Sequence, residues 1–248
     1  MIIEDVERRV WAALRPVDAV SRRPLDVLLR VHGSGQRWRR NLSGLLVLHE
    51  LSEPAARRAE FDEYEATFSA PTAIAPPAAI RATIDDPRGR YLARAVTIEL
   101  PRSDAGTGLP PLFEPIDVPM YPAASAPLAA PWSVVRVHAE RGGLPAGGCV
   151  ITVHEVGDET QVLGRGQSDA RGEAVVAVPG VPLFIPSGGP DAFVREREVE
   201  ATAVFEPAAG GPPDTDTLAV ASGTGFVRAT VTVVIASGRT TPLAINLP

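Results

Sequence analysis

The sequence contains no lysine, because all 24 of its basic residues are arginine. This absence excludes a Schiff-base lysine and the lysine of a phosphate-binding loop. The single cysteine, Cys149, excludes a disulfide within the chain, so the fold must depend on its hydrophobic core. The 30 acidic residues outnumber the basic ones and give a net charge of −6. This charge disfavours nucleic-acid binding, because phosphate contacts need a positive surface.

Long apolar runs are also missing. No stretch reaches the roughly 18 residues that a membrane-spanning helix needs, so we expect no membrane insertion. The first nine residues, Met1 to Arg9, include acids where a signal peptide needs a positive region followed by an apolar run. We therefore expect a cytoplasmic protein, or one that forms part of an assembled particle.

Proline and glycine are abundant, with 25 and 22 residues in a chain of 248. Prolines end helices and punctuate strands, and an apolar spacing typical of a helix almost nowhere lasts for three turns. Between these breaks the sequence is rich in valine, isoleucine, leucine, threonine and alanine, often in alternation with polar residues. This pattern predicts an all-β protein with a buried core.

A proline-rich stretch divides the chain. It contains Pro101, Pro110, Pro111, Pro115, Pro119, Pro122, Pro127 and Pro131. Such segments are typical semi-rigid spacers, although the apolar run from Leu112 to Tyr121 suggests that part of this one lies against a domain or pairs at a sheet edge. We expect two antiparallel β-sandwich domains, residues 1–101 and 132–248, joined by a linker at 102–131.

Strands are expected wherever side chains alternate between apolar and polar. In the first half these are residues 25–31, 45–51, 64–68, 80–84 and 91–100. In the second half they are residues 133–139, 149–156, 161–167, 173–178, 199–205, 227–235 and 243–247. The long loops at 184–195 and 207–225 are expected to be mobile or to make contacts.

The first residues allow two interpretations. Val6, Val10 and Leu14 have the spacing of a helix, whereas Val10, Ala12 and Leu14 alternate like a strand and are followed by Pro16. We favour the strand, because a short isolated helix has little to stabilise it.

Two turns have similar sequences, Asp86-Pro87-Arg88-Gly89 and Asp169-Ala170-Arg171-Gly172. Each precedes an expected strand that ends at a proline, Pro101 in one case and Pro179 in the other. The glycine supplies the left-handed residue that such a reversal needs. A duplicated domain and a shared type of turn both explain the likeness, and the sequence leaves the choice open.

The second half resembles a known family. Leu144-Pro145-Ala146-Gly147 precedes one strand, Ser168–Glu173 forms the turn into the next, and Pro179-Gly180 ends that strand. In this order, the run from Val134 to Val181 resembles the carboxypeptidase-regulatory-like, transthyretin-type β-sandwiches. The resemblance implies an immunoglobulin- or transthyretin-like sandwich and says little about function.

Shorter segments resemble another group. Arg22–Leu25, Asn41–Gly44, Asp86–Leu92 and Leu100–Arg102 are similar to uncharacterised bacterial proteins associated with phage-tail-like particles. This resemblance implies a structural or accessory part of a contractile tail or injection apparatus, and it defines no functional residue.

A search for catalytic and metal-binding patterns favours structural interpretations. The histidines show no metal-ligand spacing and lie on or beside expected strands; they are His32, His49, His138 and His154. Cys149 lies in an apolar run, as buried inert thiols do. Ser34 lies in a Gly-Ser-Gly turn without the full nucleophile-elbow motif. Asp85-Asp86 and Asp214-Thr215-Asp216 suit turn capping better than calcium. We therefore expect no enzyme, cofactor or metal.

The segment Arg37-Trp38-Arg39-Arg40 is the most unusual local feature. On a strand, Trp38 would share a face with Arg40, while Arg37 and Arg39 share the other. Three charges must then reach solvent or acidic partners. Tryptophan and arginine are enriched at interaction hot spots, so this segment is the candidate protein interface; a core tryptophan flanked by solvated arginines is the competing interpretation.

These observations favour a non-enzymatic structural or adaptor subunit that assembles with protein partners or with itself, in a phage-tail-like particle if the resemblance holds. The alternative is a β-sandwich module that binds a glycan or a peptide, although the low aromatic content of 5% offers few rings for stacking on sugars.

Overall fold

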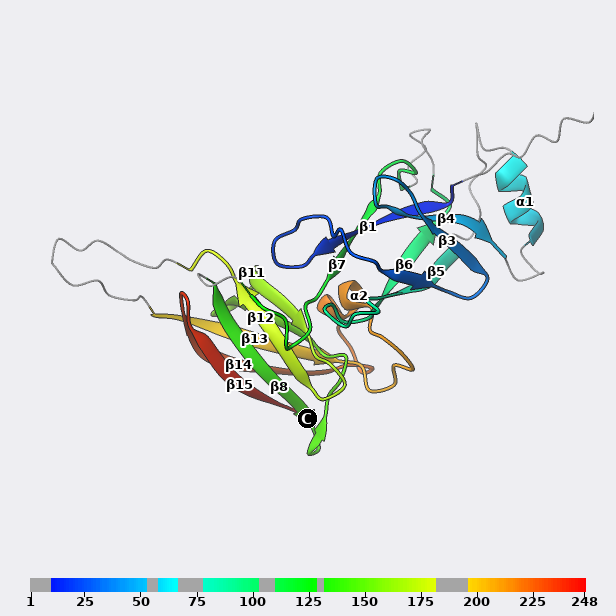
Figure 1. The fold of residues 1–248 in the computed structure, drawn as a ribbon. Coiled ribbons are helices and arrows are strands. Elements are labelled where there is room, and N and C mark those ends of the chain that lie inside the picture. The colour runs from blue at the N-terminus through cyan, green and yellow to red at the C-terminus, as the bar shows by residue number, and fades with distance from the viewer. Residues whose placement is uncertain (1–9, 53–57, 67–77, 103–109, 129–131, 182–195) are drawn as a thin grey trace, which may run out of the picture. The chain divides into compact units, whose positions relative to one another are not determined.

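The computed structural model describes residues 10–52, 58–66, 78–102, 110–128, 132–181 and 196–248. Within these residues strands predominate, as predicted, and two helices accompany them, α1 (Arg58–Ala66) and α2 (Thr215–Ala219) (Figure 1). The chain divides into two compact units. One holds Met1–Val17, Arg23–Ile84 and Ala95–Pro119, and the other holds Asp18–Arg22, Asp85–Arg94 and Met120–Pro248. The domain boundaries expected at residues 101 and 132 stay a prediction.

The first unit contains two sheets. The order in one sheet is β3 (Gln36–Arg40), β4 (Leu46–Leu51), β1 (Ala12–Asp18) and β7 (Ile116–Met120). The order in the other is β2 (Arg30–His32), β5 (Ala78–Asp85) and β6 (Arg94–Leu100). Strand β1 is buried almost throughout, which agrees with the strand interpretation of residues 10–14. Residues 1–9, on which the helical alternative depends, lie outside the described residues.

Two strand predictions in the first unit were wrong. Residues 25–31 form a strand only from Arg30 onward, and residues 64–66 belong to helix α1. Residues 67 and 68 lie outside the described residues. Alanine, glutamate and arginine in this stretch favour a helix, and Phe61 is buried against Trp11 with ring centroids 5.6 Å apart. Alternation alone could not show whether a partner strand lies within reach.

Part of the expected linker is ordered sheet. Strand β7 is the last strand of its sheet, which agrees with the edge pairing expected for this apolar stretch. Beyond it, the backbone N–H of Ala123 donates to Arg90 O at 2.8 Å, and that of Leu92 donates to Tyr121 O at 2.8 Å. These bonds belong to the second unit and tie residues 120–124 to residues 90–92.

The second unit contains a β-sandwich. One sheet has the order β11 (Asp158–Gln167), β10 (Val150–Glu155), β13 (Glu196–Phe205) and β14 (Val227–Ala236). The other has β12 (Glu173–Val178), β8 (Ser133–Arg141) and β15 (Thr240–Leu247), with β9 (Leu144–Pro145) beside β8. All seven strands expected here are present. The pairing of β15 with β8 is parallel, which the antiparallel prediction missed.

The core between these sheets is made of small and branched side chains, chiefly valine, alanine and isoleucine. Strand β11 comes close to β12, since a Cβ on Gly164 or Gly166 would lie within 2.6 Å of a carbonyl oxygen of β12. This side of the sandwich is therefore closed without bulky side chains. The loop expected at 207–225 contains helix α2, and the loop at 184–195 lies outside the described residues.

Candidate functional site

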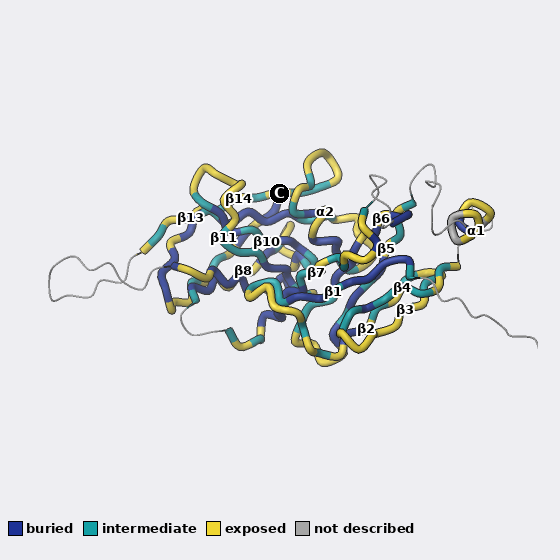
Figure 2. The backbone as a smooth tube through the Cα atoms, turned by 90° about the horizontal axis from the view of Figure 1, so that it is seen from above, coloured by how far each residue is buried: buried dark blue, intermediate teal, exposed yellow. Residues whose placement is uncertain are grey.

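The arginine and tryptophan segment forms strand β3, at the end of a sheet. In the described part of the chain, β3 is hydrogen-bonded to one strand, β4. Figure 2 shows β3 in the colours of exposed and half-buried residues, whereas β1 of the same sheet is buried. An edge strand presents a row of backbone N–H and C=O groups that can pair with another chain. The predicted interface residues thus lie where a partner strand can add.

The register places the side chains of β3 on two faces. Trp38 is opposite the buried Leu48, and Arg39 is opposite Val47. Trp38 is half buried, and its Nε1 donates to Gln36 Oε1 at 3.0 Å. The tryptophan is therefore neither in the buried core nor fully exposed, while its neighbouring arginines are exposed. The choice between an interface and a core tryptophan stays a prediction.

The three arginines differ in their partners. Arg37 Nε is 3.4 Å from Glu50 Oε1, an exposed pair that contributes little to stability. Arg40 donates to Val27 O at 2.8 Å and to Asp26 Oδ1 at 3.2 Å, so it also holds the preceding loop. Arg39 has no ion pair within the described residues and is exposed. Arg39 is therefore the most available cation of the strand.

The surrounding sequence is strongly basic. Residues 19–45 contain six arginines and one acidic residue, Asp26, in a chain with a net charge of −6. Such local asymmetry favours an acidic partner surface, because complementary potentials steer association and select partners.

The predicted structural histidines include one buried example. His154 is 1% exposed; its Nε2 is 2.9 Å from Thr202 Oγ1 and its Nδ1 is 2.9 Å from Glu155 O. His154 is therefore a satisfied buried histidine. Cys149 is fully buried, and burial raises the pKa of its thiol to about 12, so it is unsuited to nucleophilic chemistry.

The acidic pairs tested for calcium have other partners. Asp86 accepts the backbone N–H groups of Arg88 and Arg90. Asp214 caps helix α2, and Asp216 Oδ2 is 2.6 Å from the guanidinium of Arg94. Among the described residues, no three His, Cys, Asp or Glu side chains gather as metal ligands do.

Arg94 is the feature that sequence reasoning missed. It is fully buried, and besides Asp216 its Nη2 has Asp214 Oδ1 at 3.7 Å. Nearby, Gln167 Nε2 donates to Ala93 O at 2.8 Å. All of these contacts lie within the second unit, to which Ala93 and Arg94 belong. A lone arginine inside an apolar stretch was the available signal, but its partners lie over 100 residues away.

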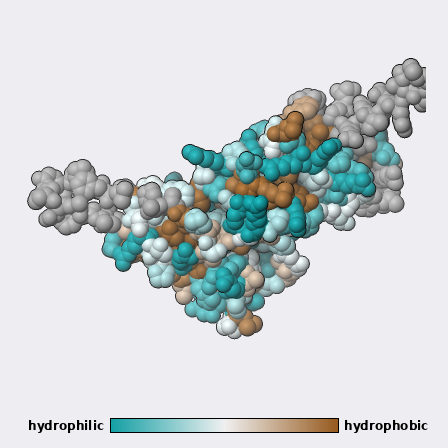
Figure 3. All heavy atoms as spheres, viewed as in Figure 1, coloured by the Kyte–Doolittle hydropathy of each residue, from teal (hydrophilic) through white to brown (hydrophobic). Residues whose placement is uncertain are grey.

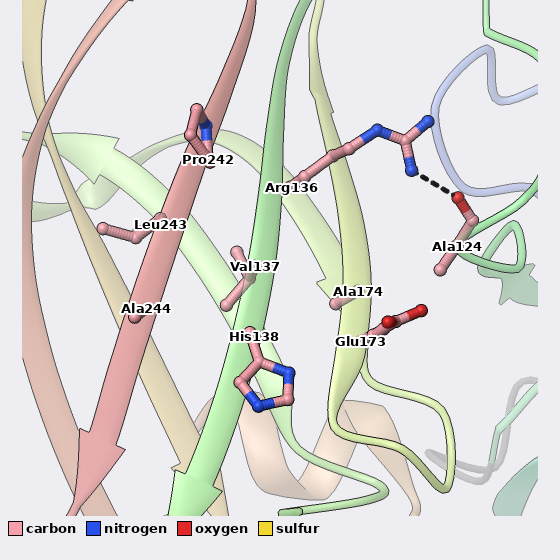
Figure 4. A pocket seen from close by; sticks show the side chains of 9 residues that line it. All are labelled: Ala124, Arg136, Val137, His138, Glu173, Ala174, Pro242, Leu243 and Ala244. Atoms are coloured by element: carbon pink, nitrogen blue, oxygen red, sulfur yellow. Dashed lines mark hydrogen bonds between the residues drawn. The ribbon is translucent and has the colours of Figure 1, made fainter.

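A second candidate site is a pocket on the outer face of β12, β8 and β15, with a volume of about 490 Å³ (Figure 4). Cross-strand register places Glu173 opposite His138 and Ala244 beside it. Arg136 lies along β8 and donates to Ala124 O at 2.6 Å. One side of the pocket is therefore charged, while Pro242 and Leu243 make the other apolar.

Exposed apolar side chains are scattered over both units. The face drawn in Figure 3 mixes brown hydrophobic and teal hydrophilic side chains. The large exposed ones are Leu28, Leu42, Phe113, Leu144, Val156, Val162, Val220 and Val234. Single exposed side chains of this kind are common and define no site alone. None of the described helices is long and apolar enough to cross a membrane.

In comparisons with known proteins, no family model matches the chain, and no curated protein or solved structure matches it.

Proposed function

We propose that this protein is a non-enzymatic structural or adaptor subunit that works by binding other proteins. The observation that carries the proposal is strand β3, an edge strand with exposed Arg37 and Arg39 beside the half-buried Trp38. Strand addition supplies affinity through backbone hydrogen bonds, and the arginines supply specificity for an acidic partner. On the resemblance of its N-terminal segments, we propose a phage-tail-like particle as the assembly.

The test is purification of the tagged full chain from its native cells, at low and at high salt. We expect an acidic protein to co-purify in a fixed ratio and to be lost as salt rises, because exposed charges are screened. The combined variant Arg37→Ser and Arg39→Ser should lose this protein.

A matched control changes Arg171 and Arg239, two exposed arginines of the second unit, to serine. It should keep the co-purifying protein. If both double variants keep the co-purifying protein, β3 is not part of the interface. If no protein co-purifies in a fixed ratio, the adaptor role is contradicted. Changing Arg40 to serine separately reports on the loop contact to Val27.

The pocket of Figure 4 supports a second candidate function, a module that binds a small ligand or a peptide. Its volume lies within the roughly 300 to 1,000 Å³ typical of ligand sites, and it combines apolar walls with a few charged groups. Titration of the purified chain with glycan and peptide libraries would test this function. Binding that His138→Ala abolishes and His32→Ala preserves would favour it over the adaptor role.

A further inference from the structure

Strand β14 is an edge strand that, beyond Arg228 near its start, lacks the usual protection against pairing. It ends the sheet β11-β10-β13-β14 and is hydrogen-bonded, among described strands, to β13 alone. Residues 229–236 read Ala-Thr-Val-Thr-Val-Val-Ile-Ala, with neither charge nor proline. Long β-branched edges of this kind are templates for pairing with another chain.

Three other edge strands carry such protection. Strand β15 contains Pro242, β7 contains Pro119, and β3 carries its three arginines. Proline removes a backbone donor, and like charges repel an identical strand. On the β11 side of the sandwich, the close approach of β11 to β12 closes the structure. On the other side, β15 reaches β14 at Val234, while Thr230 and Thr232 of β14 stay exposed.

The direction of the free backbone groups follows from a contact at the end of β14. Thr241 Oγ1 donates to Val234 O at 3.3 Å, so Val234 directs its backbone groups away from β13. In an antiparallel strand both groups of a residue point to the same side, and alternate residues share that side. Thr232 and Thr230 therefore point their N–H and C=O groups outward, where no described strand receives them.

An apolar rim accompanies this edge. Val227, Ala229, Val231 and Leu243 pack against the core but are only partly buried. Val234, on the opposite face of β14, is 46% exposed. A strand added beside β14 would cover this rim and satisfy the outward backbone groups together.

We infer that β14 pairs antiparallel with β14 of a second copy of this chain, which joins their four-stranded sheets into one. The uncharged, alternating threonines and valines are self-complementary, because a two-fold axis places residues of the same kind opposite one another without repulsion. Strand β3, by contrast, cannot pair with its own copy, since that would bring arginines together. The inference deepens the proposed assembly role by giving the chain one self-pairing edge and one edge for an acidic partner.

The test is the mass of the purified full chain by sedimentation equilibrium. We expect a species of twice the 26.1 kDa chain mass. Thr232→Pro removes an outward N–H while the ladder to β13 remains, so it should raise the dimer dissociation constant about tenfold or more, because each copy loses one donor. Thr232→Ser keeps the N–H and should leave the constant unchanged.

Circular dichroism and thermal unfolding check that each variant is folded. If Thr232→Pro does not fold, Thr232→Lys replaces it, with Gln161→Lys on the opposite edge strand β11 as the matched control. A monomeric wild type, or a dimer that withstands the folded edge variant, overturns the inference. The variant with Arg37→Ser and Arg39→Ser should still dimerise, so loss of the acidic partner and loss of self-pairing are separate results.

Discussion

The two Asp-x-Arg-Gly turns share their local structure and differ in their surroundings. In each turn the glycine N–H donates to the aspartate carbonyl at 2.9 Å, and the glycine has a positive φ, 66° at Gly89 and 75° at Gly172. In each turn the aspartate side chain also accepts the backbone N–H groups two and four residues later. Local sequence therefore produced the same turn twice.

The environments of the two glycines are different. A Cβ on Gly89 would meet no atom within 4 Å, whereas a Cβ on Gly172 would lie 2.2 Å from Ala139 O. The second turn is also bonded to β8, because Ala139 N donates to Gly172 O at 2.8 Å. The segment after the first turn is held by the ion pairs of the buried Arg94 instead. One turn is thus fixed by backbone packing and the other by a polar anchor.

The largest effect is expected for Gly172→Ala. The new Cβ adds a left-handed strain and a clash with backbone that cannot move cheaply, so we expect a loss of about 4 kcal/mol in the free energy of unfolding. Denaturant unfolding of the full chain measures it. A loss equal to that of Gly89→Ala would show that the close approach to β8 is unimportant.

The polar anchor is tested by Arg94→Met. The substitution removes the buried cation that lies 3.7 Å from the carboxylate of Asp214, which is 7% exposed, and we expect a loss of about 3 kcal/mol. The double variant with Asp214→Asn should recover part of that loss, and a double-mutant cycle reports the coupling. Purely additive losses would contradict a coupled pair.

The aspartates of both turns should make stability depend on pH. Burial would raise the pKa of Asp86, but the backbone N–H groups of Arg88 and Arg90 outweigh it and hold the pKa below the ordinary 3.8. The same balance, with Arg171, lowers the pKa of Asp169.

A carboxyl whose pKa is lower in the folded chain stabilises the fold above its ordinary pKa, and this stabilisation is lost as pH falls through the folded value. Asp86→Asn and Asp169→Asn should therefore each cost about 1 kcal/mol near neutral pH and flatten the loss of stability below about pH 4. Denaturant unfolding at several pH values measures both effects. If both variants lose stability below about pH 4 as the unchanged chain does, these carboxyls are not the cause of that loss.

A similarly small effect is expected for Gly89→Ala. The Cβ has space, so only the left-handed backbone is strained, and we expect a loss of about 1 kcal/mol. Gly89→Asn is the control, since asparagine tolerates this conformation better and should lose less. Equal losses for the two variants would show that the lost free energy comes from the surroundings of the added side chain and not from backbone strain.

The accuracy of the sequence predictions followed the packing of each region. In the second unit, strands such as β10 and β13 have both a periodic pattern and a partner, and all of the expected strands formed. In the first unit, residues 64–66 alternate but belong to a helix, because Phe61 packs on Trp11 and the residues around it favour helix. Alternation marks a possible buried face and does not supply the partner strand.

The candidate sites show the same division. The sequence predicted the exposure of Arg37 and Arg39, because three arginines lie so close together. It did not predict that β3 is the last strand of its sheet. Arg94 drew no attention in the sequence, because its partners at residues 214 and 216 approach it only after folding. The uncharged run of β14 was recognised as a strand, while its position at an edge was not.

The sequence by itself determined the β class, the position of most strands in the second unit and the chemistry of its turns, because propensity, period and turn residues act over a few neighbours. Tertiary structure decided which strands are edges, that β15 runs parallel to β8, and that a buried arginine holds residues more than 100 positions apart. These features depend on which surfaces of the chain pack together when it folds, and a pattern of neighbouring residues does not contain that information.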